Sequence, residues 1–197
     1  MAYEVRNEYY RAAKRHLAVC LQLQNNLLEI RKIEDKNSSL NKGEIMLKDH
    51  LLTDLYYLAG YVIECTYCMV IFHHFPKIKH KKTLVAELGG VGKKNISFRS
   101  KINENPETCI IADGNHRLGG FQKVFGENYL KVATPINLSV FNKCQNLFDE
   151  WEAEVRYNKA ETEPIKFNLT INQVFDFLSG AKAVFNACKN FHPETRD

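Results

Sequence analysis

Glu64 is the one charged residue in the apolar stretch between Leu55 and Phe72. A carboxylate inside an apolar helix must be paired, protonated or hydrogen-bonded, because burying a lone charge is costly. We expect its partner to be Arg156, which precedes Tyr157 on a helix late in the chain. Two interpretations stay open: the group joins helices structurally, or it contacts a nucleotide or takes part in catalysis.

Basic residues gather in one segment, residues 77–101. This segment has eight basic residues and a single acid, Glu87, whereas the rest of the chain has 19 basic and 22 acidic residues. The eight are Lys77, Lys79, Lys81, Lys82, Lys93, Lys94, Arg99 and Lys101. Such a segment could lie along RNA phosphates, with Phe98 available to stack on a base, and its affinity would then fall steeply with salt. The alternative is a solvated loop.

Two further patterns suggest chemistry that their context does not support. Residues 89–94 resemble a phosphate-binding loop, but Glu87 and Lys94 stand where that motif needs glycine and a magnesium-binding hydroxyl. Cys65 and Cys68 form a lone C-x-x-C inside an apolar helix, without the second ligand pair that zinc requires. We interpret both cysteines as core thiols and expect no metal and no cofactor.

These residues depend on long helices for their positions. Apolar residues recur every three or four positions from Val5 to Lys36, and a second helical stretch runs from Glu44 to Phe75, where Pro76 stops it. A polar connector joins the two. They therefore form an antiparallel hairpin with arms of about 45 Å.

The remainder of the chain predicts further helices and no strand. Residues 77–114 form a basic, glycine-containing loop insertion, and short helical spacing follows from Asn115 to Phe125. Helical spacing also extends from Val140 to Tyr157, and a last helix starts at the Thr170 capping box with Gln173. The sequence thus predicts an all-α antiparallel bundle of about five helices in one domain, residues 1–197.

Composition is that of an ordinary globular protein, with 45% hydrophobic and 25% charged residues and a net charge of +4. The first thirty residues carry several charges and no apolar run, so we expect a cytoplasmic protein without a signal peptide or membrane anchor. Glu64 argues against membrane insertion of the apolar stretch around it. The six cysteines are scattered, so disulfides are not expected.

Four segments agree, in order, with one known family. They are Tyr9–Leu17, Asp54–Cys65, Asn115–Leu118 and Trp151–Tyr157, and the second has a small-residue turn followed by an apolar pair and Glu64. Together they resemble the HEPN superfamily. Its members are helical bundles, often dimeric, that act as ribonucleases in toxin and phage-defence systems or as partners of nucleotidyltransferases. The resemblance implies a homodimer, a nucleotide or RNA ligand and a nucleotidyltransferase-type partner, and it adds His116 to the ligand-binding candidates Glu64, Arg156 and Tyr157.

Catalytic members of that superfamily carry an Arg followed four to six residues later by a His. Neither Arg117 nor Arg156 has such a His, so the only match is Arg11 with His16. A five-residue step turns about 140° around a helix, so these side chains do not share a face. Metal-free RNA cleavage needs both a base and a phosphate-binding cation.

The sequence therefore favours a HEPN-like, non-catalytic module that binds nucleotides or associates with RNA, as part of a toxin-antitoxin or phage-defence type of system. Two alternatives remain. One is a metal-independent ribonuclease that uses Arg11 and His16. The other is a structural protein-interaction domain.

Overall fold

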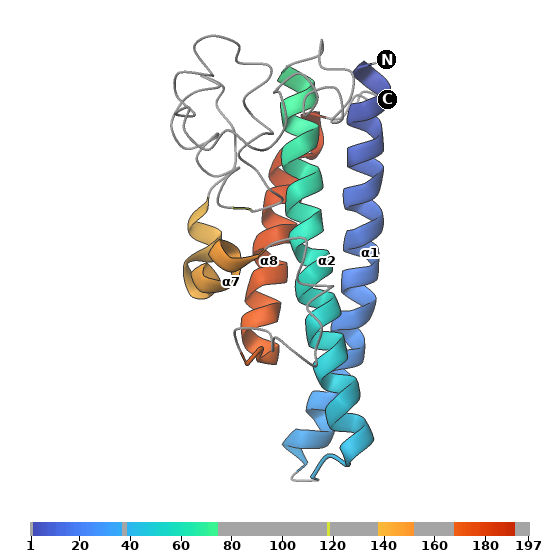
Figure 1. Ribbon diagram of the computed structural model, residues 1–197, viewed down its shortest axis with the longest axis vertical. Coiled ribbons are helices and arrows are strands. Elements are labelled where there is room, and N and C mark those ends of the chain that lie inside the picture. Colours follow the sequence, from blue (N-terminus) through green and yellow to red (C-terminus); the bar gives the residue numbers. More distant parts are fainter. Residues whose placement is uncertain (1, 37–38, 75–117, 119–137, 152–167, 192–197) are drawn as a thin grey trace, which may run out of the picture.

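Two long helices, α1 (Ala2–Asp35) and α2 (Lys42–His74), lie side by side and antiparallel in the computed structural model (Figure 1). The structure describes residues 2–36, 39–74, 118, 138–151 and 168–191. All regular structure in those residues is helical, so the predicted all-α bundle with an N-terminal hairpin is confirmed.

The hairpin is held by a seven-residue repeat on α1. Ala13, Cys20 and Leu27 share one helical position and are all fully buried, because a seven-residue spacing keeps side chains on the face toward a neighbouring helix. At the far end, the backbone N–H of Glu44 donates to the Asn41 side chain at 3.0 Å, and the Asn41 N–H donates to the Glu44 carboxylate at 2.8 Å. This capping box starts α2 two residues before the predicted start.

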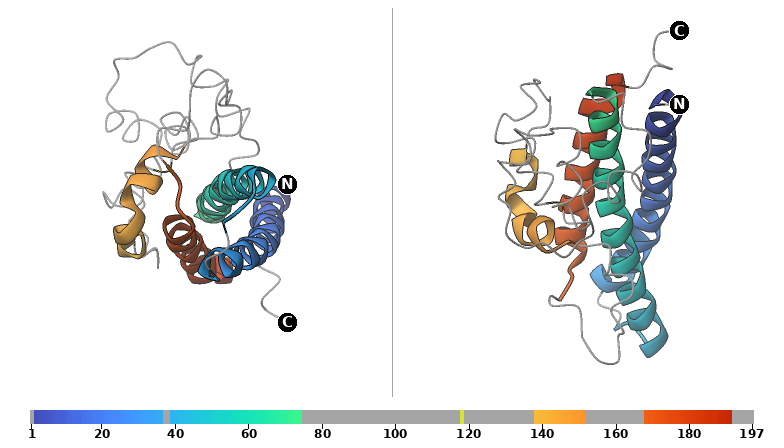
Figure 2. Two further views of the ribbon diagram at one scale, coloured as in Figure 1. Left: turned by 90° about the horizontal axis from the view of Figure 1, so that it is seen from below. Right: turned by 45° about the horizontal axis from the view of Figure 1, so that its top comes forward.

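The third long helix, α8 (Ile171–Cys188), packs against α2 and more lightly against α1 (Figures 1 and 2). It starts at the predicted capping box, in which Thr170 accepts from the Gln173 N–H and the Gln173 side chain accepts from the Thr170 N–H. Its buried face supplies a large part of the core: Val174, Phe177, Leu178, Ala181, Val184, Phe185 and Cys188. A short 3₁₀ turn, η3 (Lys189–Phe191), follows.

The helix expected from Val140 to Tyr157 differs from the prediction. The structure has a 3₁₀ helix, η1 (Leu138–Cys144), and then a short α-helix, α7 (Gln145–Glu150). Trp151 is already extended, with φ −68° and ψ 129°. The reason is tertiary, because the extended residue lets the indole reach α2. Figure 2 shows η1 and α7 on the side of α8 that is away from α1.

Five of the six cysteines fall in the described residues, and all five are free thiols in the core: Cys20, Cys65, Cys68, Cys144 and Cys188. Burial raises the pKa of Cys20 to about 12 and that of Cys188 to about 12. The prediction of core thiols for Cys65 and Cys68 is confirmed. None of the described helices combines the length and the apolar character that crossing a membrane requires.

Candidate functional site

Glu64 lies where the sequence predicts, inside the bundle. Every residue from Val62 to Val70 is buried, and Glu64 itself is only 3% exposed. It is one of three buried polar residues in the described core, with Asn7 and Thr66. The Thr66 hydroxyl donates to the Val62 carbonyl, so its hydrogen-bond donor is satisfied within α2 itself. A carboxylate cannot be satisfied by its own helix in this way, since it only accepts hydrogen bonds.

His16 on α1 packs against α2 one turn before Glu64. Its ring lies 5.6 Å from the Tyr61 ring, one turn from Glu64 on α2, and the side chain is half-buried. Burial lowers the pKa of His16, and the Arg15 cation lowers it further, while the Glu64 charge acts in the opposite direction. The imidazole is therefore mostly neutral at pH 7, with a partial attraction to the acid beside it.

Tyr9 approaches the same stretch of α2 from two turns earlier on α1. Burial is the main cause of its strongly raised pKa, and Cys68, Cys65 and Glu64 raise it further. Its hydroxyl is hydrogen-bonded to the Cys68 thiol. Tyr9 and His16 thus place two polar rings of α1 near the stretch of α2 that contains Glu64, Cys65 and Cys68.

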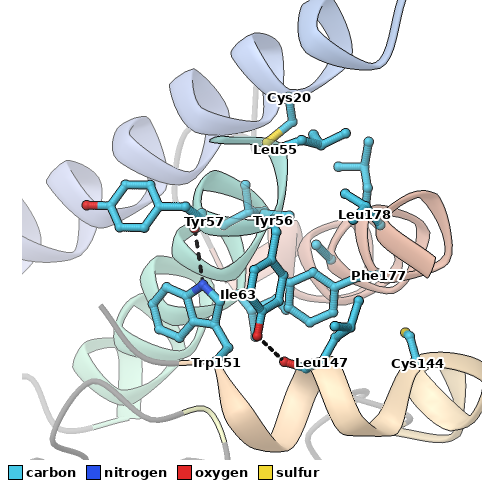
Figure 3. Close-up of a cluster of buried hydrophobic side chains, with 14 of the residues drawn as sticks. Cys20, Leu55, Tyr56, Tyr57, Ile63, Cys144, Leu147, Trp151, Phe177 and Leu178 are labelled. Atoms are coloured by element: carbon cyan, nitrogen blue, oxygen red, sulfur yellow. Dashed lines mark hydrogen bonds between the residues drawn. The ribbon is translucent and has the colours of Figure 1, made fainter. Parts of the chain in front are cut away.

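Trp151 packs on α2 close to this stretch, and Figure 3 shows its indole N–H directed at the Tyr57 backbone. The Trp151 ring meets Tyr61 edge-on at 5.3 Å, and its indole N–H donates to the Tyr57 carbonyl at 3.3 Å. Gly60 allows this approach, because a Cβ at that position would overlap the indole ring. The small-residue turn before Glu64 therefore has a packing role in the structure.

The predicted partner of Glu64 cannot be placed. Arg156, Tyr157 and His116 lie outside the described residues, so the pairing with Arg156 stays a prediction. The same holds for the basic segment, whose residues all lie outside them: Lys77, Lys79, Lys81, Lys82, Lys93, Lys94, Arg99 and Lys101. The described part of the candidate site thus consists of Glu64 with His16, Tyr61 and Tyr9.

Arg11 and His16 occupy different surroundings. Arg11 is exposed, whereas His16 packs against Tyr61 in the hairpin interface. The charge of Arg15, its neighbour in the chain, lowers the pKa of His16, and the charge of Glu64 raises it. Arg11 and His16 thus differ in burial, and their joint action on one phosphate stays a prediction.

A second polar cluster joins the ends of three helical elements, and the sequence analysis missed it. The Arg6 guanidinium contacts His73 Nδ1 at 2.8 Å, and the His73 ring lies 5.0 Å from the Phe191 ring. Burial and the Arg6 charge lower the pKa of His73, whereas a hydrogen bond to the Phe191 backbone raises it. The antiparallel pairing of α1 with α2 could have suggested the contact, since it brings residues near 6 and 73 to one level.

Among the described residues, no group of three or more His, Cys, Asp and Glu side chains is arranged to hold a metal ion. Comparison of the chain with protein-family models, with curated proteins and with solved structures found no match. The HEPN resemblance therefore rests on the four sequence segments alone, and what it implies remains a proposal.

Proposed function

We propose that this protein is a non-catalytic, RNA-associated module that binds phosphates through its basic segment and the adjoining end of the helical hairpin. The observation that carries the proposal is the uneven charge along the hairpin. Between residues 6 and 16, α1 has four basic residues and one acid, and Arg11, Lys14 and Arg15 are exposed. Between residues 29 and 49, at the other end, five basic residues balance five acids.

The basic segment continues the chain from the same cationic end. The Arg6–His73 contact puts the last turn of α2 at the level of the first turns of α1. Arg11, Lys14 and Arg15 lie five to nine residues beyond Arg6, which is about 8–14 Å along the axis at 1.5 Å per residue. Residue 77 follows only three positions after the end of α2. The exposed cations at this end of α1, with the basic segment next in sequence after α2, favour a polyanion, and affinity for RNA would come from phosphate contacts.

The buried acid has a structural part in this proposal. Glu64 is 3% exposed, so a nucleotide could reach its carboxylate only if the core opened. Its charge instead acts on His16 and Tyr9 across the hairpin interface. A direct nucleotide contact by Glu64, Arg156, Tyr157 or His116 is thus the less favoured form of the proposal. The cytoplasmic location, the phage-defence context and the nucleotidyltransferase-type partner stand beside it as expectations.

The test is filter binding of a single-stranded RNA to three proteins. The first is the wild type, and the second replaces Lys77, Lys79, Lys81 and Lys82 by Gln. The third is a control of equal net charge that replaces Lys32, Lys36, Lys42 and Lys143, all exposed, by Gln. We expect about tenfold or greater weakening for the segment variant and near-wild-type binding for the control. Equal weakening of both variants, or no RNA binding by the wild type, would refute the proposal.

The ribonuclease alternative is decided in the same preparation. Incubation with total RNA should leave the RNA intact. Cleavage by the wild type that disappears in a His16→Ala variant would replace the binding-only proposal with a catalytic one, with His16 in the hairpin interface as the reacting group.

A further inference from the structure

The outer face of α1, which lies along one edge of the bundle in Figure 1, changes from basic to uncharged along its length. Ala13, Cys20 and Leu27 are fully buried, so the positions two before and two after each of them lie about 160° away and point outward. These positions form two neighbouring rows, in which every residue is exposed: Arg11, Ala18 and Asn25 in one, and Arg15, Gln22 and Glu29 in the other. Each row therefore runs from a cation through to an amide.

The surface beyond Arg15 carries no charge for twelve residues, from Leu17 to Leu28, although 25% of the whole chain is charged. Charged side chains ordinarily cover the exposed side of a surface helix. Charge returns at Glu29, whose carboxylate lies 2.7 Å from the Lys32 ammonium. The exposed positions in this stretch include small, apolar and amide side chains: Ala18, Val19, Leu21, Gln22, Asn25 and Asn26. Such a surface next to cations suits a ligand that is part anion and part uncharged ring.

Ala18 makes a low apolar floor between the cations and the amides. It lies one turn after Arg15 and one turn before Gln22, and its methyl group is shorter than the side chains on either side of it. Val19 and Leu21 flank it and are 48% and 37% exposed. The flat face of a nucleobase is sequence-independent and packs on surfaces of this kind, with its edge left open to hydrogen-bonding groups.

The amides beyond this floor offer a donor and an acceptor side by side. The Gln22 Nε2 group donates to Asn26 Oδ1 at 3.4 Å, which orients both amides and leaves the Gln22 oxygen and the Asn26 N–H groups to accept and donate outward. Asn25 adds a third exposed amide. This pattern matches the amine and ring nitrogen of adenine, the base to which Asn and Gln bind through two hydrogen bonds.

We propose that the outer face of α1 binds an unpaired nucleotide of single-stranded RNA and prefers adenine. The phosphate contacts Lys14 and Arg15, the base covers Ala18, and its edge bonds to the amides. Arg15 and Gln22 are seven residues apart, which is about 10 Å along the axis and comparable with the reach of one nucleotide from phosphate to base edge. The inference rests on the proposed RNA binding and adds which RNA is bound and where its bases lie.

The amides favour RNA over an acidic protein segment as the occupant. An acidic segment would pair with the cations and leave the uncharged stretch unused. Duplex RNA would do the same, because its base edges lie in a groove that side chains do not read. A single strand supplies a phosphate and an open base edge in one unit, so it complements the cations, the floor and the amides together.

The experiment is fluorescence anisotropy with labelled oligo(A) and oligo(U) of about ten nucleotides, the site size of a small RNA-binding surface. The wild type should bind oligo(A) at least about fivefold more tightly than oligo(U). The double variant Gln22→Ala with Asn25→Ala should bind both equally, with the oligo(U) affinity and its salt dependence unchanged, because the phosphate contacts remain. The control is Asn146→Ala with Asn186→Ala, two exposed amides elsewhere, which should keep the preference.

All four positions are exposed and alanine favours a helix, so circular dichroism should show wild-type helix content in both variants. Equal binding of the two oligonucleotides by the wild type, or a preference that survives in the Gln22→Ala, Asn25→Ala variant, would overturn this inference and leave the proposed RNA binding standing. Displacement of oligo(A) by duplex RNA or by polyglutamate of the same charge, as readily as by unlabelled oligo(A), would also overturn it. Absence of any RNA binding by the wild type would refute both proposals.

Discussion

The His16 ring of α1 lies 5.6 Å from the Tyr61 ring of α2, one turn before Glu64, and the charge of Glu64 acts on the imidazole against the effect of burial. The acid is almost fully buried, while the imidazole keeps partial access to water. A buried acid thus acts on an imidazole whose pKa burial holds below its usual value.

Replacing Glu64 by Gln should lower the pKa of His16 further. The Glu64 charge favours the imidazolium, and without it burial and the Arg15 cation act unopposed. An NMR titration that follows the ring protons of His16 measures the change. Glu29→Gln, at an exposed position far along α1, is the control and should leave the titration as it is. A His16 pKa that stays unchanged or rises in Glu64→Gln would show that the two groups do not interact.

The free energy of unfolding should fall as the pH drops below about 6.5, the ordinary pKa of histidine. His16 and His73 both have lowered pKa values in the folded protein. Between the two pKa values of each group the unfolded chain binds more protons, so stability rises with pH there and is lost toward acid. Urea unfolding at a series of pH values measures this slope.

The His73→Gln variant isolates one part of that slope. It removes the imidazole that contacts Arg6 and Phe191, so its unfolding free energy should depend less on pH than that of the wild type. His50→Gln removes an exposed imidazole from the same helix as a control. Equal slopes for the two variants would rule out a lowered pKa of His73 as the cause.

Gly60→Ala should destabilise the protein by about 1–3 kcal/mol, the usual cost of forcing extra volume into a packed core. The added methyl group would overlap the Trp151 indole, which also donates to the Tyr57 carbonyl. Urea unfolding of Gly60→Ala, Trp151→Phe and the double variant gives the coupling between the positions. Additive effects on the free energy of unfolding would mean that positions 60 and 151 do not interact. Gly43→Ala, at an exposed glycine, is the control.

Local patterns in the sequence predicted the long helices correctly. The seven-residue spacing of Ala13, Cys20 and Leu27 predicts the hairpin seam, and Thr170 with Gln173 predicts the start of α8. The same capping rule applied to Asn41 and Glu44 would have placed the start of α2 correctly. These features depend only on residues a few positions apart.

Features that depend on distant residues were missed. The contact of His16 with Tyr61 depends on the register of α1 against α2, and the pattern of each helix alone does not determine that register. The end of α7 at Glu150 follows from the fit of Trp151 onto Gly60, 91 positions earlier in the chain. Helical spacing runs through Glu150 and Trp151 in the sequence, and the tertiary contact ends α7 there.

The salt dependence of RNA binding tests the central claim most directly. For single-stranded RNA, the logarithm of the binding constant falls with the logarithm of salt concentration by about 0.7 for each phosphate contact. The account predicts a steep slope for the wild type, and a slope about 2 to 3 units flatter when Lys77, Lys79, Lys81 and Lys82 are replaced by Gln. Equal slopes for these two proteins would contradict it.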